Sequence, residues 1–321
     1  MQKVSIIVPI FNSIENVQRA LESIKQQTYA NLEIIMVDDG STDGSSRVCE
    51  SFQEKDERFV FIKKENGGVA DARNVGIAAA TGSVIMFVDS DDYIEKEAVS
   101  IAINTMEKES ADLVIFGFKR IYKDKTIATK IENKEITKEE ALQELCLDEK
   151  ITSHLWNKAY KKELFADLSM VKGKIYEDIY IMHSIIDRCS KIIGIDKILY
   201  SYCRTNKKSI STGCNQKQLE DYEFAINSRK EYVKKKQPII YSKIEEKVNF
   251  LIVNKNFEYL IFSIIHKNEI TEKSRQFVIE HKNLLFKYRK NIKTKLQYWL
   301  IKKNSNVLNN IVLFFYNKEE K

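Results

Sequence analysis

Short apolar runs alternate with segments of helical periodicity over the first 120 residues. A helical stretch at residues 14–27 carries Val17, Leu21 and Ile24 at spacings of four and three, which gives one apolar face. Apolar runs of strand length occupy residues 4–10, 32–37, 59–62, 83–88 and 112–118. Alternation of this kind predicts an α/β fold in which helices cover a parallel sheet.

The pattern changes in the second half of the chain. Residues 131–147 include a charged helix, and residues 192–203 alternate as a strand does, but all ten glycines lie at or before Gly213. From residue 213 onward, 22 Lys and Arg face 12 Asp and Glu, a charge of +10, whereas the whole chain carries +6. We therefore expect an α/β domain over residues 1–212 and a basic α-helical extension over residues 213–321.

The bulk composition is that of a folded protein. Of the 321 residues, 43% are hydrophobic and 31% are charged, which excludes a disordered chain. Pro9 and Asn12 interrupt the first apolar segment too early for a signal peptide, and no uninterrupted apolar run approaches eighteen residues. We expect the protein in the cytoplasm.

Cysteine and histidine usage excludes two further classes of site. The five cysteines are odd in number, widely spread and without a CxxC pair, so a disulfide framework is not expected. The four histidines, at positions 154, 183, 266 and 281, have no metal-ligand spacing, which argues against a zinc hydrolase.

Candidate chemistry gathers where predicted strands end. Residues 89–92 (DSDD) follow one strand, and Asp39 follows another. Two carboxylates on a short turn can present oxygens to Mg²⁺ or Mn²⁺ and leave room for phosphate ligands, while the 67–68 glycines admit a ligand close to the backbone. Arg73 offers a planar donor fork suited to phosphate. Each feature alone is an ordinary turn or cap, but parallel strands bring all of them to one edge of the sheet.

Four ordered segments resemble the motifs of family 2 glycosyltransferases with the GT-A fold: residues 5–12 (SIIVPIFN), 37–43 (VDDGSTD), 66–76 (NGGVADARNVG) and 89–92 (DSDD). The resemblance continues more loosely to about residue 212. It implies a Rossmann-like, mostly parallel sheet flanked by helices. It also implies an inverting enzyme that moves a sugar from a nucleotide donor, commonly a UDP-sugar, to an acceptor hydroxyl, with Mn²⁺ or Mg²⁺ as cofactor.

The resemblance also implies roles for individual residues on the donor side. Pro9 and Phe11 line the base pocket, Asp39 accepts the uracil N–H, and Arg73 lies near the diphosphate. Asp91 is the direct metal ligand, and Asp89 approaches the ribose or the metal, although Asp92 can take either place. The remaining implied donor-binding residues are Asn66, Ser90, Arg204 and Ser209.

Glu177 and Asp178 open a helical segment, where carboxylates are also ordinary caps. The resemblance makes Asp178 the general base and places Glu177 against the donor sugar or the acceptor. It also makes residues 204–209 a loop that folds over the diphosphate, although the histidine often found there is missing. Trp156 and Lys158 match a Trp-x-Lys segment loosely, and Trp156 fits either a core position or an acceptor platform.

The sequence of the C-terminal tail is compatible with more than one binding partner. Residues 281–318 contain nine Lys or Arg and no acid, with apolar residues at roughly helical spacing. Such a helix suits binding to an anionic membrane that carries a glycan or lipid-linked glycan acceptor. It equally suits packing of its apolar face on the catalytic domain, or on a second subunit as in a homodimer. No nucleic-acid motif accompanies the charge, so no nucleic-acid partner is expected.

The resemblance implies work in bacterial surface polysaccharide biosynthesis, such as capsule assembly. A nucleotidyltransferase on a related sheet is the competing enzyme class, but residues 9–16 lack the Gly and Lys that its loop requires. A non-catalytic sugar-binding or scaffold subunit predicts damaged acidic motifs, and these are intact.

Overall fold

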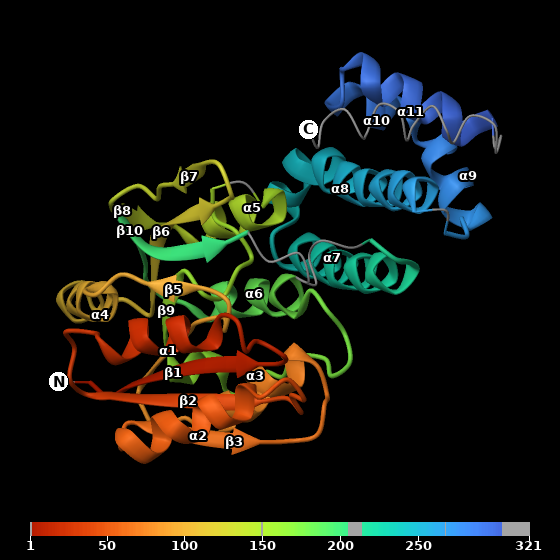
Figure 1. Ribbon diagram of the computed structural model, residues 1–321. Helices are drawn as coiled ribbons and strands as arrows, with labels where there is room; N and C mark the ends of the chain where they lie inside the picture. The colour runs from red at the N-terminus through yellow and green to blue at the C-terminus, as the bar shows by residue number, and fades with distance from the viewer. Residues whose placement is uncertain (1, 149, 205–213, 267, 304–321) are drawn as a thin grey trace. The chain divides into compact units, whose positions relative to one another are not determined.

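The computed structural model describes residues 2–148, 150–204, 214–266 and 268–303 (Figure 1). The chain divides into two compact units, residues 1–207 and 208–321. The predicted domain boundary at residue 212 falls outside the described residues.

The first unit begins with a four-stranded parallel block. Strand β1 pairs with β2 on one side and β4 on the other, and β3 pairs with the outer edge of β2. Every residue of β1 and β2 is buried, as their apolar runs predict for strands covered on both faces. The strands are β1 (Val4–Ile10), β2 (Leu32–Asp38), β3 (Phe59–Lys63) and β4 (Val84–Phe87).

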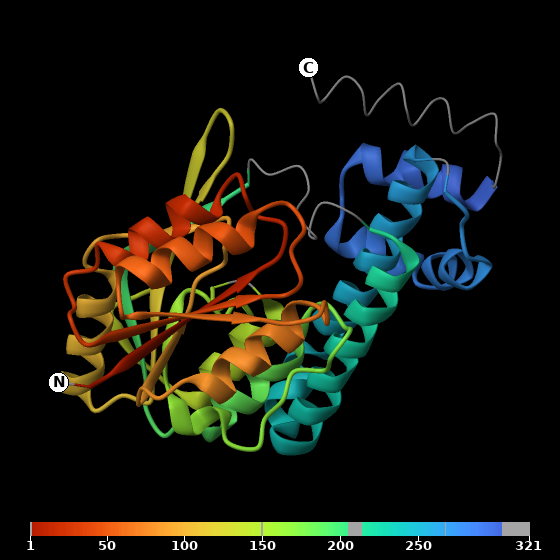
Figure 2. The same ribbon diagram turned by 60° about the horizontal axis from the view of Figure 1, so that its bottom comes forward.

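Helices cover both faces of this block (Figure 2). The chain steps outward from β1 to β3 through α1 and α2, then returns to β4 through α3. Because parallel crossovers are right-handed, this reversal puts α1 and α2 on one face and α3 on the other. The helices are α1 (Val17–Lys25), α2 (Ser45–Lys55) and α3 (Val69–Ala79).

Small residues let α3 lie very close to the sheet. A Cβ added to Gly76 would stand 2.4 Å from Cγ2 of Ile7 on β1, and Ala70 and Ala72 are also buried. The helix begins after Gly68, whose φ of +87° favours glycine. The glycine-rich segment thus sets the height of α3, and with it the position of Arg73.

The other half of the sheet is mixed rather than parallel. The strand order is β3-β2-β1-β4-β9-β6-β10-β5, with β7 on β6 and β8 on β10. Strand β9 is antiparallel to both β4 and β6, whereas β6 and β10 are parallel. These strands are β5 (Tyr93–Ile94), β6 (Leu113–Ile121), β7 (Thr126–Thr129), β8 (Lys134–Ile136), β9 (Lys158–Lys161) and β10 (Ile192–Cys203).

Strands β5 and β9 were not predicted from the sequence. Residues 93–94 form β5 against β10, and the next helix begins after them at Ala98. The remaining elements of this unit are α4 (Ala98–Glu109), α5 (Lys138–Leu147), the 3₁₀ turn η1 (Lys162–Phe165) and α6 (Glu177–Arg188).

The described part of the second unit is helical, as the lack of glycine after Gly213 predicts. Helix α8 supplies the centre of its core through Val253, Phe257 and Leu260, which pack with Val278 of α9 and Leu285 of α10. Its helices are α7 (Gln216–Lys236), α8 (Pro238–Ile265), α9 (Glu272–Glu280), α10 (Lys282–Tyr288) and α11 (Ile292–Lys303).

Helix α8 also has the length and apolar composition to cross a membrane. Its most apolar stretch has a mean hydropathy of 1.2, and 44% of that stretch is buried inside the protein. No uninterrupted apolar run marks this helix in the sequence, because polar residues are scattered along it. Core helices of soluble proteins pass the same test, so α8 is weak grounds for a membrane span.

Candidate active site

The carboxyl ends of β1, β2 and β4 meet where the strand order reverses, with β1 between β2 and β4 (Figure 1). Open α/β sheets bind ligands at such a reversal. Pro9 lies buried near the end of β1, and the next residue but one, Phe11, is 50% exposed. Phe11 is therefore available to contact a ligand at this edge.

Asp38 is a structural residue. It is fully buried, and its carboxylate accepts the Ser41 N–H at 2.9 Å and the Ser46 hydroxyl. These bonds hold the turn that leads into α2.

Asp39 organises the neighbouring glycine turn. Its carboxylate accepts Lys64 Nζ at 2.5 Å and the backbone N–H groups of Gly67 and Gly68 at 2.9 and 2.7 Å. Its own N–H donates to the carbonyl of Ile10 at 2.8 Å, which ties β2 to the end of β1. Asp39 therefore fixes the glycine turn against this edge, and leaves the adjoining Asn66 exposed.

Arg73 joins the turn of residues 89–92, called the acidic turn below, to α6. The residue is 5% exposed; Nη2 donates to Asp89 Oδ1 at 2.7 Å, and Nη1 donates to Glu177 Oε1. Its Nε is buried without a hydrogen-bond partner. The structure shows the Arg73 guanidinium between two carboxylates, and its expected place near a diphosphate stays a prediction.

The acidic turn divides its carboxylates between two tasks. Asp92 is fully buried and accepts the Tyr200 hydroxyl and the Cys203 N–H, both at 2.7 Å. Burial raises its pKa well above the usual range, and the neighbouring charges of Asp89 and Asp91 add to the rise. Asp92 therefore anchors the turn to β10 and has no exposed surface.

Asp89 and Asp91 stay on the accessible side of the turn, both half-buried. The carbonyl of Asp91 accepts Arg19 Nη2 at 2.6 Å, and Ser90 Oγ lies 2.7 Å from Ser13 Oγ. The turn is thus held to the segment after β1 through the Asp91 carbonyl and the Ser90 hydroxyl.

These carboxylates suit a divalent ion only in part. Among the described residues no group of three or more His, Cys, Asp or Glu is placed to hold a metal. Because Asp92 is bonded to β10, the turn offers a metal the carboxylates of Asp89 and Asp91 at most, and Asp89 already gives one oxygen to Arg73. Such a pair fits an ion that takes its other ligands from phosphate oxygens and water.

Glu177 and Asp178 open α6 after Tyr176, whose φ of 65° ends the preceding loop. Burial raises the pKa of Glu177 to about 7, although Arg73 acts in the opposite direction. Burial would also raise the pKa of Asp178, but His154 and then Arg73 outweigh it and hold that pKa below its usual value. The pKa values of these two adjacent carboxyl groups are thus displaced in opposite directions.

Asp178 is the more accessible of the two, with a side chain 22% exposed against 6% for Glu177. Its Oδ1 accepts the N–H of Ile179 at 2.7 Å, and its Oδ2 lies 3.7 Å from His154 Nδ1. An ionised, accessible carboxylate with a fixed orientation has the properties of a general base.

Aromatic rings stack beneath His154. Its ring lies on Trp156 with centroids 4.6 Å apart, and Trp156 lies on Tyr200 at 4.3 Å, with interplanar angles of 14° and 15°. Trp156 is 4% exposed, so of the two alternatives for this residue the structure favours the core position. No sequence signal marked His154 or Tyr200, because their neighbours come from distant segments.

Lys158 is also structural. The side chain is fully buried and donates to the carbonyls of Thr152 and His154 and to Asn157 Oδ1, at 2.9, 2.5 and 2.7 Å. It shapes the loop that carries His154.

The predicted lid is described only at its first residue. Arg204 is exposed; its Nη1 donates to the Tyr202 hydroxyl at 2.9 Å, and its guanidinium lies over the Tyr202 ring. Ser209 lies outside the described residues.

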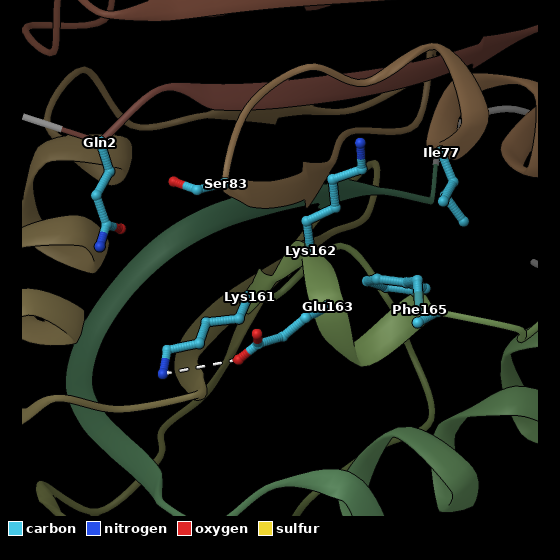
Figure 3. A pocket seen from close by; sticks show the side chains of 8 residues that line it. Gln2, Ile77, Ser83, Lys161, Lys162, Glu163 and Phe165 are labelled. Atoms are coloured by element: carbon cyan, nitrogen blue, oxygen red, sulfur yellow. Dashed lines mark ion pairs between the residues drawn. The ribbon is translucent and has the colours of Figure 1, made fainter.

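A separate pocket of about 590 Å³ lies at the amino-terminal edge of the sheet (Figure 3). It is lined by Gln2, Ser83, Lys161 and Glu163 among others, and Lys161 and Glu163 form an ion pair at 4.0 Å. Its Lys162 donates to the carbonyl of Ala80. This pocket is remote from the carboxylates described above, so its size says nothing about the site.

Comparison with known proteins adds a family and a fold. Residues 5–169 match the family described as "Glycosyl transferase family 2". The chain is 34% identical over 220 residues to glycosyltransferase GlyG of Streptococcus pneumoniae, a match covering 65% of this chain and 73% of GlyG. It is 31% identical over 247 residues to glycosyltransferase GlyA of the same organism, covering 71% of this chain but only 34% of GlyA.

Solved structures agree on the architecture. The fragment 1–349 of S. aureus TarS, crystallised with UDP-GlcNAc, superposes with a TM-score of 0.64 at 18% identity, covering 94% of this chain and 92% of that one. The mannosyltransferase PcManGT of Pyrobaculum calidifontis, in complex with GDP-Man and Mn²⁺, gives 0.57 at 15% identity, covering 95% and 87%. At these identities the likeness shows the fold alone, which is the expected GT-A α/β fold with a helical C-terminal region.

Proposed function

The chain belongs to glycosyl transferase family 2, and on that premise we propose that it moves a sugar, with inversion, from a UDP-sugar to an acceptor hydroxyl. TarS was crystallised with UDP-GlcNAc, and GlyG is a bacterial glycosyltransferase. We propose a glycan or lipid-linked glycan of the bacterial surface as the acceptor, and the cytoplasmic side of the membrane as the place of the reaction.

The observation that carries this proposal is the pair of carboxyl groups at the start of α6. Asp178 is ionised and accessible, so it can take the proton of the acceptor hydroxyl as that oxygen attacks the anomeric carbon. Glu177 is buried and bonded to Arg73, so it holds the base next to the acidic turn instead of competing for the proton. Inversion follows if base and leaving group lie on opposite faces of the sugar.

On the donor side, we propose that Phe11 contacts the base and that Asp39 reads it. An ionised carboxylate has about four acceptor positions. Lys64, Gly67 and Gly68 occupy three of them on Asp39. One position remains, and the uracil ring has one N–H to donate.

Asp91 and Asp89 are the residues that would hold a divalent cation, Mn²⁺ or Mg²⁺. Bound there, such an ion would neutralise the negative charge of the leaving nucleoside diphosphate. We propose that Arg73 acts on the same charge indirectly, by fixing the orientation of Asp89.

Replacing the base tests the catalytic assignment. Asp178→Asn should lower sugar transfer about 10²- to 10⁴-fold, the usual contribution of a general base, while UDP still stabilises the protein. Asp187→Asn, nine residues along the same helix, is the matched control. Near-normal transfer by folded Asp178→Asn protein would remove Asp178 from the reaction.

A donor screen tests the substrate class. Each nucleotide sugar is added with and without Mn²⁺ or Mg²⁺, and both the melting temperature and the release of nucleotide are followed. We expect a UDP-sugar to stabilise the protein in the presence of the metal, since binding to the folded state alone raises stability. Absence of any UDP effect under all conditions would overturn the uridine assignment.

The second unit carries an apolar row that we propose contacts an anionic membrane surface. Ile292, Leu296 and Trp299 share one face of α11 and are 84%, 37% and 43% exposed. No acid lies within α11, which ends in Lys302 and Lys303. Apolar residues beside lysines suit an interface with anionic lipids.

Deleting the tail would not test this surface, because Tyr298, Leu300 and Ile301 belong to the core of the unit. The double variant Ile292→Ser/Trp299→Ser leaves that core intact and should lose sedimentation with anionic liposomes. Ile239→Ser, at a 74% exposed site on α8, is the control. Equal pelleting of all three proteins, or a shift from dimer to monomer in the double variant, would contradict membrane contact.

A further inference from the structure

His154 stands beside the residue proposed as general base. Its Nδ1 lies 3.7 Å from Asp178 Oδ2, and its side chain is 28% exposed. Building on the proposed function, we infer that His154 is a positioning residue that holds the Asp178 carboxylate toward the acceptor hydroxyl. It acts through Asp178 and does not itself take part in bond making.

The imidazole is held from two sides. Lys158 Nζ donates to the His154 carbonyl at 2.5 Å, which fixes the backbone of the loop. The ring itself lies flat on Trp156, and the edge of Trp156 meets Phe118 at 4.8 Å and 86°. Because the backbone and the ring plane are both fixed, Nδ1 has a defined position relative to α6.

The same stack reaches the acidic turn. Trp156 lies on Tyr200, whose hydroxyl donates to Asp92 Oδ2 at 2.7 Å and accepts the N–H of Asp89 at 3.1 Å. The support of the base is therefore continuous with the support of the carboxylates proposed to hold the metal and the diphosphate. This continuity explains why a histidine at this position affects the geometry of the transfer and not merely the charge of Asp178.

The charged and titratable groups that face Asp178 come from four elements. His154 approaches from the loop before β9, Arg73 from α3, and Glu177 from α6 itself, while Tyr160 lies on β9. Among those that favour the ionised carboxylate, His154 acts most strongly and Arg73 next. Loss of the imidazole nitrogen should therefore raise the pKa of Asp178 and move the acidic limb of the rate profile to higher pH.

Two substitutions distinguish the contribution of the His154 ring from that of its Nδ1. His154→Phe keeps an aromatic ring on Trp156 but removes the nitrogen, whereas His154→Asn keeps an N–H donor near the position of Nδ1. We expect His154→Phe to lower kcat about 10- to 100-fold, as small misplacements of catalytic groups do, and to shift the acidic limb upward. We expect His154→Asn to recover most of the rate, and the donor KM to change less than about two-fold in both.

The measurement is kcat and KM across pH 4 to 9 on the whole 321-residue chain, with UDP-induced stabilisation as the control for folding and donor binding. His266→Phe, at the end of α8, is the matched control substitution. Unchanged kcat and pH profile in His154→Phe would overturn the inference while leaving the transferase function in place. Equal losses in both His154 variants with no shift of the limb would show a merely structural role, and a wild-type protein that transfers no sugar would overturn both proposals.

Discussion

Removing the buried cation at the centre of the site should destabilise the first unit strongly. Arg73→Gln leaves Asp89 and Glu177 without their shared partner. Breaking a buried ion pair on one side costs about 3–5 kcal/mol, because a charge stays buried and uncompensated. Asp89 is 26% exposed and can be rehydrated, so we expect the lower end, about 3 kcal/mol.

The second substitution, Glu177→Gln, removes the more buried of the two charges. The double variant Arg73→Gln/Glu177→Gln should therefore be more stable than the sum of the single effects predicts, by at least about 1 kcal/mol, the usual coupling of contacting residues. The deficit of Arg73→Gln should also shrink as pH falls. Without the guanidinium, burial raises the pKa of Glu177 unopposed by Arg73, and protonation of Glu177 then favours the folded state.

The chain offers a clean optical probe for this measurement. It contains two tryptophans, Trp156 in the first unit and Trp299 in the second. In a Trp299→Phe background, urea unfolding followed by fluorescence reports the stacked, buried Trp156 alone. Equal m-values among the variants would show that stability, and not the extent of unfolding, has changed. A loss below about 1 kcal/mol in Arg73→Gln, or strict additivity in the double variant, would refute the reasoning.

Three further substitutions test other contacts. Glu33→Gln should lose about 2 kcal/mol at pH 7, the scale of charge-assisted hydrogen bonds. The folded pKa of Glu33 is about 2 against an ordinary 4.5, so this stabilisation is present above pH 4.5 and disappears towards pH 2. Gly76→Ala should cost about 1–3 kcal/mol through the clash with Ile7. Tyr200→Phe should cost about 1–3 kcal/mol by removing the hydroxyl that donates to Oδ2 of buried Asp92.

Thermal unfolding at several pH values measures all three, and each has its own contrary outcome. A Glu33→Gln deficit that persists unchanged at pH 2 would contradict the depressed pKa. An unaffected Gly76→Ala protein would mean that α3 can move away from the sheet at little cost. A silent Tyr200→Phe substitution would show that the acidic turn is anchored by other contacts.

The sheet edge that carries Asp39 and Asp89 was predictable because each of its features can be recognised from neighbouring residues in the sequence. Each parallel strand is an apolar run whose end is marked by a polar residue, and right-handed crossovers bring those ends to one edge. Asp39 and Asp89 could therefore be placed near each other from the sequence. The four motifs that identified the family all lie in this regular part.

The contacts within the site were not predictable, because they join distant segments. Arg73 lies 104 residues before Glu177, and Asp92 lies 108 residues before the Tyr200 hydroxyl that turns it inward. The sequence has three equivalent acids in one turn, and only the position of β10 makes Asp92 different. Strand β9 was missed for a related reason: its four residues include two lysines, and its pairing partners determine its conformation.

Strand β9 also sets an order of events during synthesis. Its residues 158–161 pair three positions with β4 and three with β6, and so join the two halves of the sheet. The parallel block ends at residue 87, so the free edge of β4 waits about 70 residues for its neighbour, roughly 4–14 s at translation rates of about 5–20 residues/s. During that interval an apolar strand edge is open to pairing with another nascent chain. Substitutions that weaken β9 should therefore lower the yield of folded protein before they change its activity.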